Sequence, residues 1–121
     1  YDARLATPGN AAFAKAYAGR WSHAPGFAAA QGYAAATVLE AAVREAGTLD
    51  GEKLRAALAG LEAKTVLGPH KVDPANGAQA ATHAAVAQIL MGRPEVVWPR
   101  ELETANALLP YPQWGERSLI K

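Results

Sequence analysis

The sequence contains no cysteine, which excludes disulfide bonds, thiolate zinc sites and thiol nucleophiles. An excess of charge of one sign is also missing, because 12 Lys and Arg residues stand against 11 Asp and Glu residues and the formal charge is +1. A dedicated nucleic-acid binder normally carries a basic stripe, so this balance argues against nucleic acid as a partner. No apolar run approaches the roughly 18 residues of a membrane span.

Large apolar side chains are scarce as well. The chain has 121 residues, which suits one domain, and only two of them are phenylalanine, whereas about a quarter are alanine. Burying a methylene contributes about 0.8 kcal/mol, so an alanine-rich core gains little per residue. We therefore expect the chain to pack against a larger body.

A first helix is expected after Asn10, whose side chain can accept a hydrogen bond from a free helical N–H and act as the N-cap. Phe13, Tyr17 and Trp21 then recur every four residues, which places three aromatic rings along one face. We interpret this face as a packing surface, with a stacking surface for a ligand as the alternative. Proline and glycine at 25 and 26 end the pattern.

Two further helices are predicted in the first half of the chain. The longest candidate runs from Phe27 to Ala46, and Gly47 can supply the left-handed residue that closes it. Asp50 is a suitable N-cap for a third, shorter helix, whose apolar stripe includes Leu54, Leu58 and Leu61.

Beyond residue 63 the hydrophobic period shortens from near four to near two. We predict extended segments at residues 64–66, 70–72, 82–90 and 95–98. A strong turn signal lies at 73–77, and the last two segments form an antiparallel hairpin around 91–93. The tail contains Pro110 and Pro112, which favour an extended segment over a continuing helix.

Residues that carry catalytic or metal chemistry are not found in a recognisable arrangement. His23, His70 and His83 share no metal-ligand spacing, and the chain has no glycine-rich phosphate loop and no nucleophile elbow. Glu40 and Arg44 are four residues apart and are interpreted as a solvated helical ion pair. We therefore predict no metal site, no cofactor and no catalytic residue, and do not expect an enzyme.

The order and spacing of short motifs resembles the C-terminal part of branched-chain amino acid type (type I) periplasmic binding proteins. The matching residues are Phe13, Tyr17, Pro25, 32–35, 46–50, 68–73, 76–77, 88–89, Gly92 and 110–114. Each motif alone is weak, but together they occur in the correct order over nearly the whole chain.

The resemblance implies an α/β fold: the C-terminal segment of a two-lobed protein, with three helices followed by short strands, a β-hairpin and an extended proline-rich tail. It assigns residues 1–72 to the helical part of the first lobe, 73–79 to the last crossing between the lobes, and 80–121 to the hairpin and tail of the second lobe. Asp73, Pro74, Asn76 and Gly77 would then belong to the hinge.

The resemblance also implies a function, namely the solute-binding component of an ABC transporter. The ligand would be an amino acid or a similar small carboxylate, the partner a membrane permease, and the location the periplasm, with an export signal upstream of this sequence. Either Phe27 or Ala28 would contact the ligand, as an apolar wall or as an open space respectively; alternatively, Phe27 only packs the helix start. A fragment of this kind should self-associate and is not expected to bind alone.

Three other functions are compatible with the sequence. A ligand-sensing regulator of the same fold would keep the cleft and act on a cytoplasmic partner. An interaction module would bind a protein and no small ligand, and an α/β enzyme domain is a further alternative.

Overall fold

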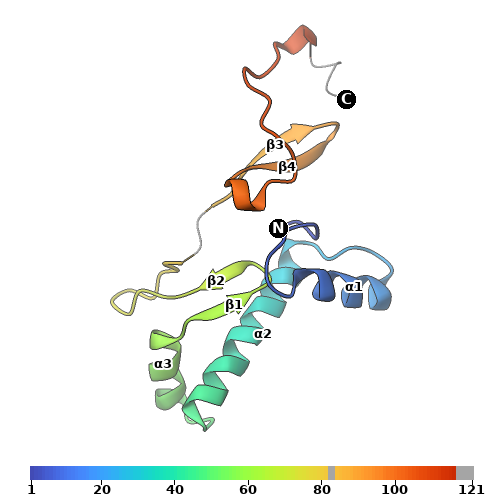
Figure 1. Cartoon of the computed structure of the whole chain (residues 1–121). Coiled ribbons are helices and arrows are strands. Elements are labelled where there is room, and N and C mark those ends of the chain that lie inside the picture. The colour runs from blue at the N-terminus through green and yellow to red at the C-terminus, as the bar shows by residue number, and fades with distance from the viewer. Residues whose placement is uncertain (82–83, 117–121) are drawn as a thin grey trace. The chain divides into compact units, whose positions relative to one another are not determined.

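A computed structural model describes residues 1–81 and 84–116 (Figure 1). Contacts between residues divide the chain into two compact units, Tyr1–His83 and Ala84–Lys121. Three α-helices and two antiparallel strand pairs are the main regular elements of the described residues, in agreement with the predicted α/β class.

The first unit opens with an irregular segment that folds back on helix α1 (Asn10–Trp21). The predicted N-cap at Asn10 is wrong. Gly9, with a φ of 77°, occupies the cap position and makes no side-chain cap bond. Asn10 is instead fully buried, and its side chain bonds to Tyr1, Asp2 and Leu5. The polar side chain was correctly singled out, but it anchors the N-terminal segment.

Helix α2 (Phe27–Ala46) forms the centre of the first unit. It ends as predicted at Gly47, whose left-handed conformation lets its N–H donate to the Val43 carbonyl. Ala30 and Ala34 lie fully or nearly fully buried on one face of α2, in a core cluster with Phe13 of α1 and Val66. Small side chains here allow the neighbouring elements to approach the helix closely.

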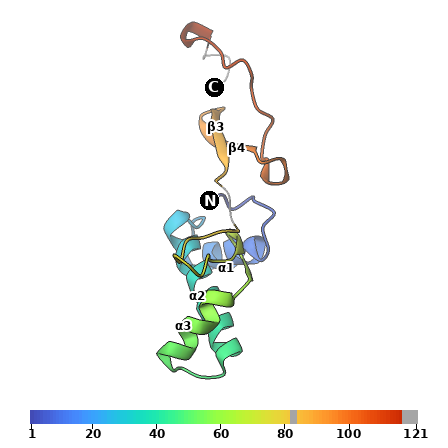
Figure 2. The ribbon, with the colours of Figure 1, turned by 90° about the vertical axis from the view of Figure 1, so that its left-hand side faces the viewer.

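Helix α3 (Gly51–Gly60) packs against α2 on its other side (Figure 1 and Figure 2). The predicted cap is confirmed, because the Asp50 carboxylate accepts the Lys53 N–H at 3.0 Å. Ala42 of α2 and Leu61, which follows α3, are the buried apolar residues of this region.

Strands β1 (Ala63–Thr65) and β2 (Gly68–His70) form a short antiparallel pair at the end of the first unit. The pair lies one or two residues before the predicted segments, because the reversal occurs at 66–67. Thr7 donates from its hydroxyl to the Val66 carbonyl at 2.6 Å, which joins the N-terminal segment to this reversal.

The second unit is built on the hairpin of β3 (Val86–Leu90) and β4 (Arg93–Trp98). The predicted hairpin is present, with its two-residue reversal at Met91 and Gly92, where φ is 53° and 76°. Positive φ at both residues identifies a type I′ turn, which suits the twist of the two strands. Of the predicted strand 82–90, residues 84 and 85 are irregular, and 82 and 83 lie outside the described residues.

The segment after β4 covers one side of the hairpin. A short 3₁₀ helix, η1 (Arg100–Leu102), is followed by Thr104, whose N–H and hydroxyl both bond to the Val96 backbone. The Thr104 hydroxyl also donates to the buried carboxylate of Glu95 at 2.5 Å. Residues 103–113 contain no helix or strand, and a single 3₁₀ turn follows at 114–116.

Candidate ligand-binding site

The two predicted ligand contacts begin helix α2. Phe27 is the first residue of the helix, and 57% of its surface is exposed to solvent. Ala28 beside it is exposed as well. Gly26 precedes them in an extended conformation and supplies no side-chain cap to the first turn. The start of α2 therefore presents an apolar ring and free backbone N–H groups to its surroundings.

The aromatic side chains of α1 form a second apolar surface in the first unit. Phe13 packs against Tyr33 of α2 with ring centroids 4.6 Å apart and the ring planes tilted by 31°, and Tyr17 lies 5.5 Å from His23, edge to face. Trp21, 55% exposed, has the Arg20 guanidinium over its ring at 5.3 Å. The predicted stripe is therefore buried at Phe13 and becomes exposed toward Trp21, close in sequence to Phe27.

The four predicted hinge residues lie in a closely hydrogen-bonded turn after β2. The Asp73 N–H donates to the Ala78 carbonyl at 2.8 Å, and the Asp73 carbonyl accepts the Gly77 N–H at 2.7 Å. The Asp73 carboxylate accepts the Ala75 N–H at 2.9 Å and the Asn76 side-chain amide at 3.0 Å. Pro74 is exposed, and Gly77 has a φ of 73°.

This turn is closed by an antiparallel bridge between Val72 and Gln79. Figure 1 shows it at one end of the β1–β2 pair, whereas α2 begins beside the opposite end. None of the described contacts joins Phe27 or Ala28 to the turn, so the structure places the two predicted parts of the site separately.

Gln79 connects the turn to β2 through its side chain. Its Oε1 accepts the N–H groups of Lys71, at 3.0 Å, and Ala81, at 3.1 Å. Two backbone donors identify this atom as the oxygen, and the Nε2 group lies 3.3 Å from His70 Nδ1.

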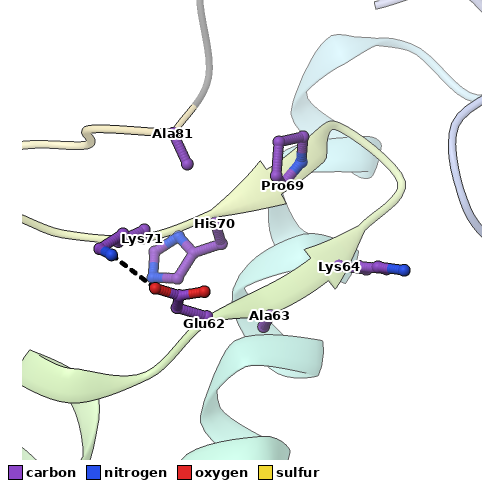
Figure 3. Close-up of a pocket in the computed structure, with 7 residues that line it drawn as sticks. All are labelled: Glu62, Ala63, Lys64, Pro69, His70, Lys71 and Ala81. Atoms are coloured by element: carbon purple, nitrogen blue, oxygen red, sulfur yellow. Dashed lines mark hydrogen bonds and ion pairs between the residues drawn. The ribbon is translucent and has the colours of Figure 1, made fainter.

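A shallow hollow of about 270 Å³ lies over these residues (Figure 3). Ala63, Pro69 and Ala81 supply its apolar walls, and the Lys71–Glu62 ion pair closes one side. The hydrogen bond from the Lys71 ammonium lowers the pKa of the Glu62 carboxyl, and the positive charge acts in the same direction. Because the hollow is small and two of its charged groups, Glu62 and Lys71, are paired with each other, it does not resemble a built ligand site.

No group of three or more His, Asp or Glu residues suitable for a metal is found within the described parts of the chain. Within the same residues, no helix is both long and apolar enough to cross a bilayer. His83, one of the three histidines considered from the sequence, lies outside those residues.

The roles of Asn10 and Gln79 were not predicted from the sequence. Both are amides that bond mainly to backbone groups of irregular segments, so no periodic pattern identifies them. For Gln79 the sequence offered one signal. The residue follows the turn at 73–77, and a chain that reverses there returns Gln79 to the end of β2.

Comparison with known proteins assigns the fold. The family model for periplasmic binding proteins matches residues 1–93, and the chain therefore belongs to this family, as its motifs indicated. A solved structure described as an ABC transporter from Rhodopseudomonas palustris is 28% identical, with a TM-score of 0.61.

The alignment with that structure covers 71% of this chain and 26% of the other chain. The chain thus spans about a quarter of the length of this solved relative. No curated protein matches it.

Proposed function

We propose that this chain is part of the solute-binding component of an ABC importer, with an amino acid or a similar small carboxylate as the ligand. The observation that carries the proposal is membership of the periplasmic binding protein family over residues 1–93. Likeness to a chain described as an ABC transporter supports import as the process. The role is binding without catalysis, in the periplasm, with a membrane permease as the partner.

The ligand contact of this chain in the proposal is either Phe27 or its neighbour Ala28. The exposure of Phe27 supports this assignment, because a residue that only packed the helix start would bury its ring against the same unit. Phe27 in this position provides an apolar wall for the ligand, whereas Ala28 in this position leaves space for a bulkier ligand. The remaining contacts come from other parts of the complete protein.

The proposed hinge consists of Asp73, Pro74, Asn76 and Gly77, with residues 1–72 and 80–121 in different lobes and 73–79 as the crossing. A ligand that touches both lobes only in the closed state shifts the open–closed equilibrium toward closure. Hydrogen exchange at the Gly77 and Ala78 amides tests this role, because exchange that is unaffected by saturating ligand contradicts a crossing at this turn.

Self-association of the 121-residue chain belongs to the same proposal. Trp21, Phe27, Tyr33 and Leu39 of the first unit each expose at least half of their surface. Exposed apolar surface promotes association in water. Light scattering over a wide concentration range tests it, and a monomer throughout that range contradicts it.

The ligand class is tested by equilibrium dialysis of the complete gene product against a mixture of amino acids, amides and small carboxylates. Bound solutes are released and identified by mass spectrometry. Enrichment of an amino acid or another carboxylate supports the proposal. Enrichment only of solutes without a carboxylate, or of no solute, contradicts it.

The site is tested with two variants of the same helix. Phe27→Ala removes the proposed wall, and Leu39→Ala truncates a comparably exposed residue, 52% against 57%, twelve positions further along α2. We expect Phe27→Ala to weaken binding of the identified ligand about tenfold or more, since burying a large apolar side chain contributes about 1.5–3 kcal/mol. Leu39→Ala should leave the dissociation constant unchanged, and equal effects of the two variants would remove Phe27 from the site.

A further inference from the structure

The turn at 73–78 holds an asparagine directly before a glycine, at Asn76 and Gly77. In such a pair the backbone nitrogen of the glycine can attack the side-chain carbonyl carbon of the asparagine, which is one reason asparagine is a thermolabile residue. Glycine favours the attack because it has no Cβ to obstruct the approach. Gly77 is exposed, and apart from its chain neighbours no heavy atom lies within 4 Å of the position that a Cβ would take.

One hydrogen bond of the turn favours this reaction. Asn76 Oδ1 accepts the Ala78 N–H at 2.8 Å. Since Ala78 follows Gly77, this bond folds the Asn76 side chain back along the Gly77 peptide. The N–H also polarises the side-chain carbonyl and stabilises negative charge on its oxygen, as a donor does for a tetrahedral intermediate.

Two other hydrogen bonds oppose the reaction, and both end on Asp73. The Gly77 N–H, which must lose its proton before the nitrogen attacks, donates to the Asp73 carbonyl at 2.7 Å. The Asn76 amide nitrogen, which must leave, donates to Asp73 Oδ2 at 3.0 Å. Asp73 therefore holds both the nucleophile and the leaving group while the turn is closed.

We propose that Asn76–Gly77 is a modification site at which the side-chain amide is converted to a carboxylate through a succinimide, and that Asp73 sets the rate of this conversion. The reaction proceeds from the population of molecules in which the turn is open. Its rate therefore follows the free energy of local opening, which the Asp73 hydrogen bonds raise.

The chemistry requires only water. The Gly77 nitrogen loses its proton to solvent and forms a bond to the Asn76 side-chain carbon, and the bond from that carbon to the amide nitrogen breaks, releasing ammonia. Water then opens the succinimide at either carbonyl, giving aspartate or its isomer in which the main chain passes through the side chain. No oxidant or reductant takes part, and the rate rises with pH because the nucleophile is the deprotonated amide.

The product alters the turn in a defined way. A neutral donor at position 76 becomes a carboxylate beside the Asp73 carboxylate, so an attractive contact at 3.0 Å is replaced by repulsion between like charges. The bridge between Val72 and Gln79 closes the same turn and is expected to weaken with it. This consequence does not depend on which solute the protein binds.

The test compares the 121-residue chain with a synthetic peptide of residues 71–80 at mildly alkaline pH. Peptide mapping by mass spectrometry follows the mass gain at Asn76, with Asn10 and Asn106 in the same chain as internal references. The peptide lacks the closed turn, so we expect Asn76 in the intact chain to react about tenfold more slowly than in the peptide, since one or two net hydrogen bonds hold the turn closed.

Two variants at position 73 separate the contributions. Asp73→Asn retains an oxygen for the Ala75 N–H but places a donor group against the Asn76 amide, and Asp73→Ala removes both side-chain bonds. We expect reaction at Asn76 to become about threefold faster in Asp73→Asn and about tenfold faster in Asp73→Ala. An asparagine at 73 does not confuse the assay, because Pro74 has no N–H with which to form a succinimide.

Asp50→Ala is the matched control, because it also removes an aspartate that accepts a backbone N–H, at the start of α3 and away from the turn. Asn76 should react at the wild-type rate in this variant. Hydrogen exchange of the β1–β2 amides shows whether each variant is folded. If Asp73→Ala is not folded, the comparison is made with Asp73→Asn alone. Equal rates in the chain and the peptide, or an unchanged rate in both position-73 variants, would overturn the proposal, as would a peptide that does not react.

Discussion

The side-chain amide of Gln88 forms two hydrogen bonds with the backbone of Leu108. The Leu108 N–H donates to Gln88 Oε1 at 2.8 Å, and Gln88 Nε2 donates to the Leu108 carbonyl at 3.1 Å. A single side chain thus pairs with both backbone groups of a residue twenty positions away, as a neighbouring strand would. The irregular tail of the second unit is fixed to β3 by this contact.

Replacing Gln88 with alanine should release the tail near Leu108. Two part-buried hydrogen bonds are lost, and we expect the Leu108 amide to exchange about tenfold faster with solvent, which corresponds to about 1.4 kcal/mol of local stability. Gln31→Ala, at an exposed position of α2, is the control and should leave this amide unchanged. Unaltered exchange at Leu108 in Gln88→Ala would mean that other contacts hold the tail.

Asn10→Ala should be among the most damaging substitutions in the first unit. It removes the hydrogen-bond partner of the Tyr1 hydroxyl and the Leu5 carbonyl, and one of the two donors to the Asp2 carbonyl, around a fully buried position. Since each unsatisfied buried group costs about 1–3 kcal/mol, we expect a loss of at least about 2 kcal/mol. Asn106→Ala, at an exposed position, should change stability by less than about 0.5 kcal/mol.

Urea unfolding followed by helical circular dichroism measures the Asn10 effect, because the three α-helices found among residues 1–81 and 84–116 belong to the first unit. A loss for Asn10→Ala no larger than for Asn106→Ala would contradict the anchoring role.

The type I′ turn of the hairpin predicts opposite effects at its two positions. Asparagine tolerates the left-handed conformation better than methionine, so Met91→Asn should stabilise the β3–β4 pairing by about 0.5 kcal/mol. Gly92→Ala introduces a Cβ at a φ of 76° and should cost about 1 kcal/mol. Hydrogen exchange of the strand amides measures both, and effects of the same sign would exclude this turn type.

The Glu62–Lys71 pair predicts a pH dependence. The pKa of Glu62 is lower in the folded chain than in the unfolded one, where it is near 4.3. The pair therefore stabilises the fold above the unfolded pKa, and this contribution disappears as the pH falls through the lowered folded pKa. Both side chains are exposed, so high salt should weaken the effect.

Lys71→Met should return the pKa of Glu62 toward its ordinary value, as followed by carbon NMR of the carboxyl group. Lys53→Met, on α3, removes a lysine outside the pair and should have no such effect. A pKa of Glu62 that is the same with and without Lys71 would show that the ion pair does not form in solution.

Local chain chemistry was sufficient to predict the helices. Gly47 closes α2 and Asp50 caps α3 because these residues act through their own backbone or the next turn. The hairpin was predictable for the same reason, since its turn lies between its two strands. The family resemblance, based on motif order, is confirmed over residues 1–93.

Contacts between distant residues were not predictable. Asn10 was expected to cap a helix because of its position before the aromatic stripe. This prediction was wrong, because its actual partners Tyr1 and Leu5 are brought to it only by the folded N-terminal segment. Strands β1 and β2 were displaced by one or two residues because their register depends on where the chain reverses.

The candidate site could be predicted from the sequence only in part, because in the proposed function its other contacts come from residues outside this chain. Phe27 and Ala28 were placed by resemblance, and their ligand contact remains a prediction. The crossing at 73–79 also remains a prediction, and the contacts of the described residues divide the chain after His83.

Solute binding is the central claim, and thermal unfolding of the complete gene product with and without ligand tests it most directly. The panel consists of branched amino acids, amides and aromatic carboxylates, with the 121-residue chain measured alongside. A true ligand at about 100 times its dissociation constant should stabilise the native state by about 2.7 kcal/mol. We predict such a shift for at least one amino acid or carboxylate, and no shift with any compound in the panel would contradict the proposed function.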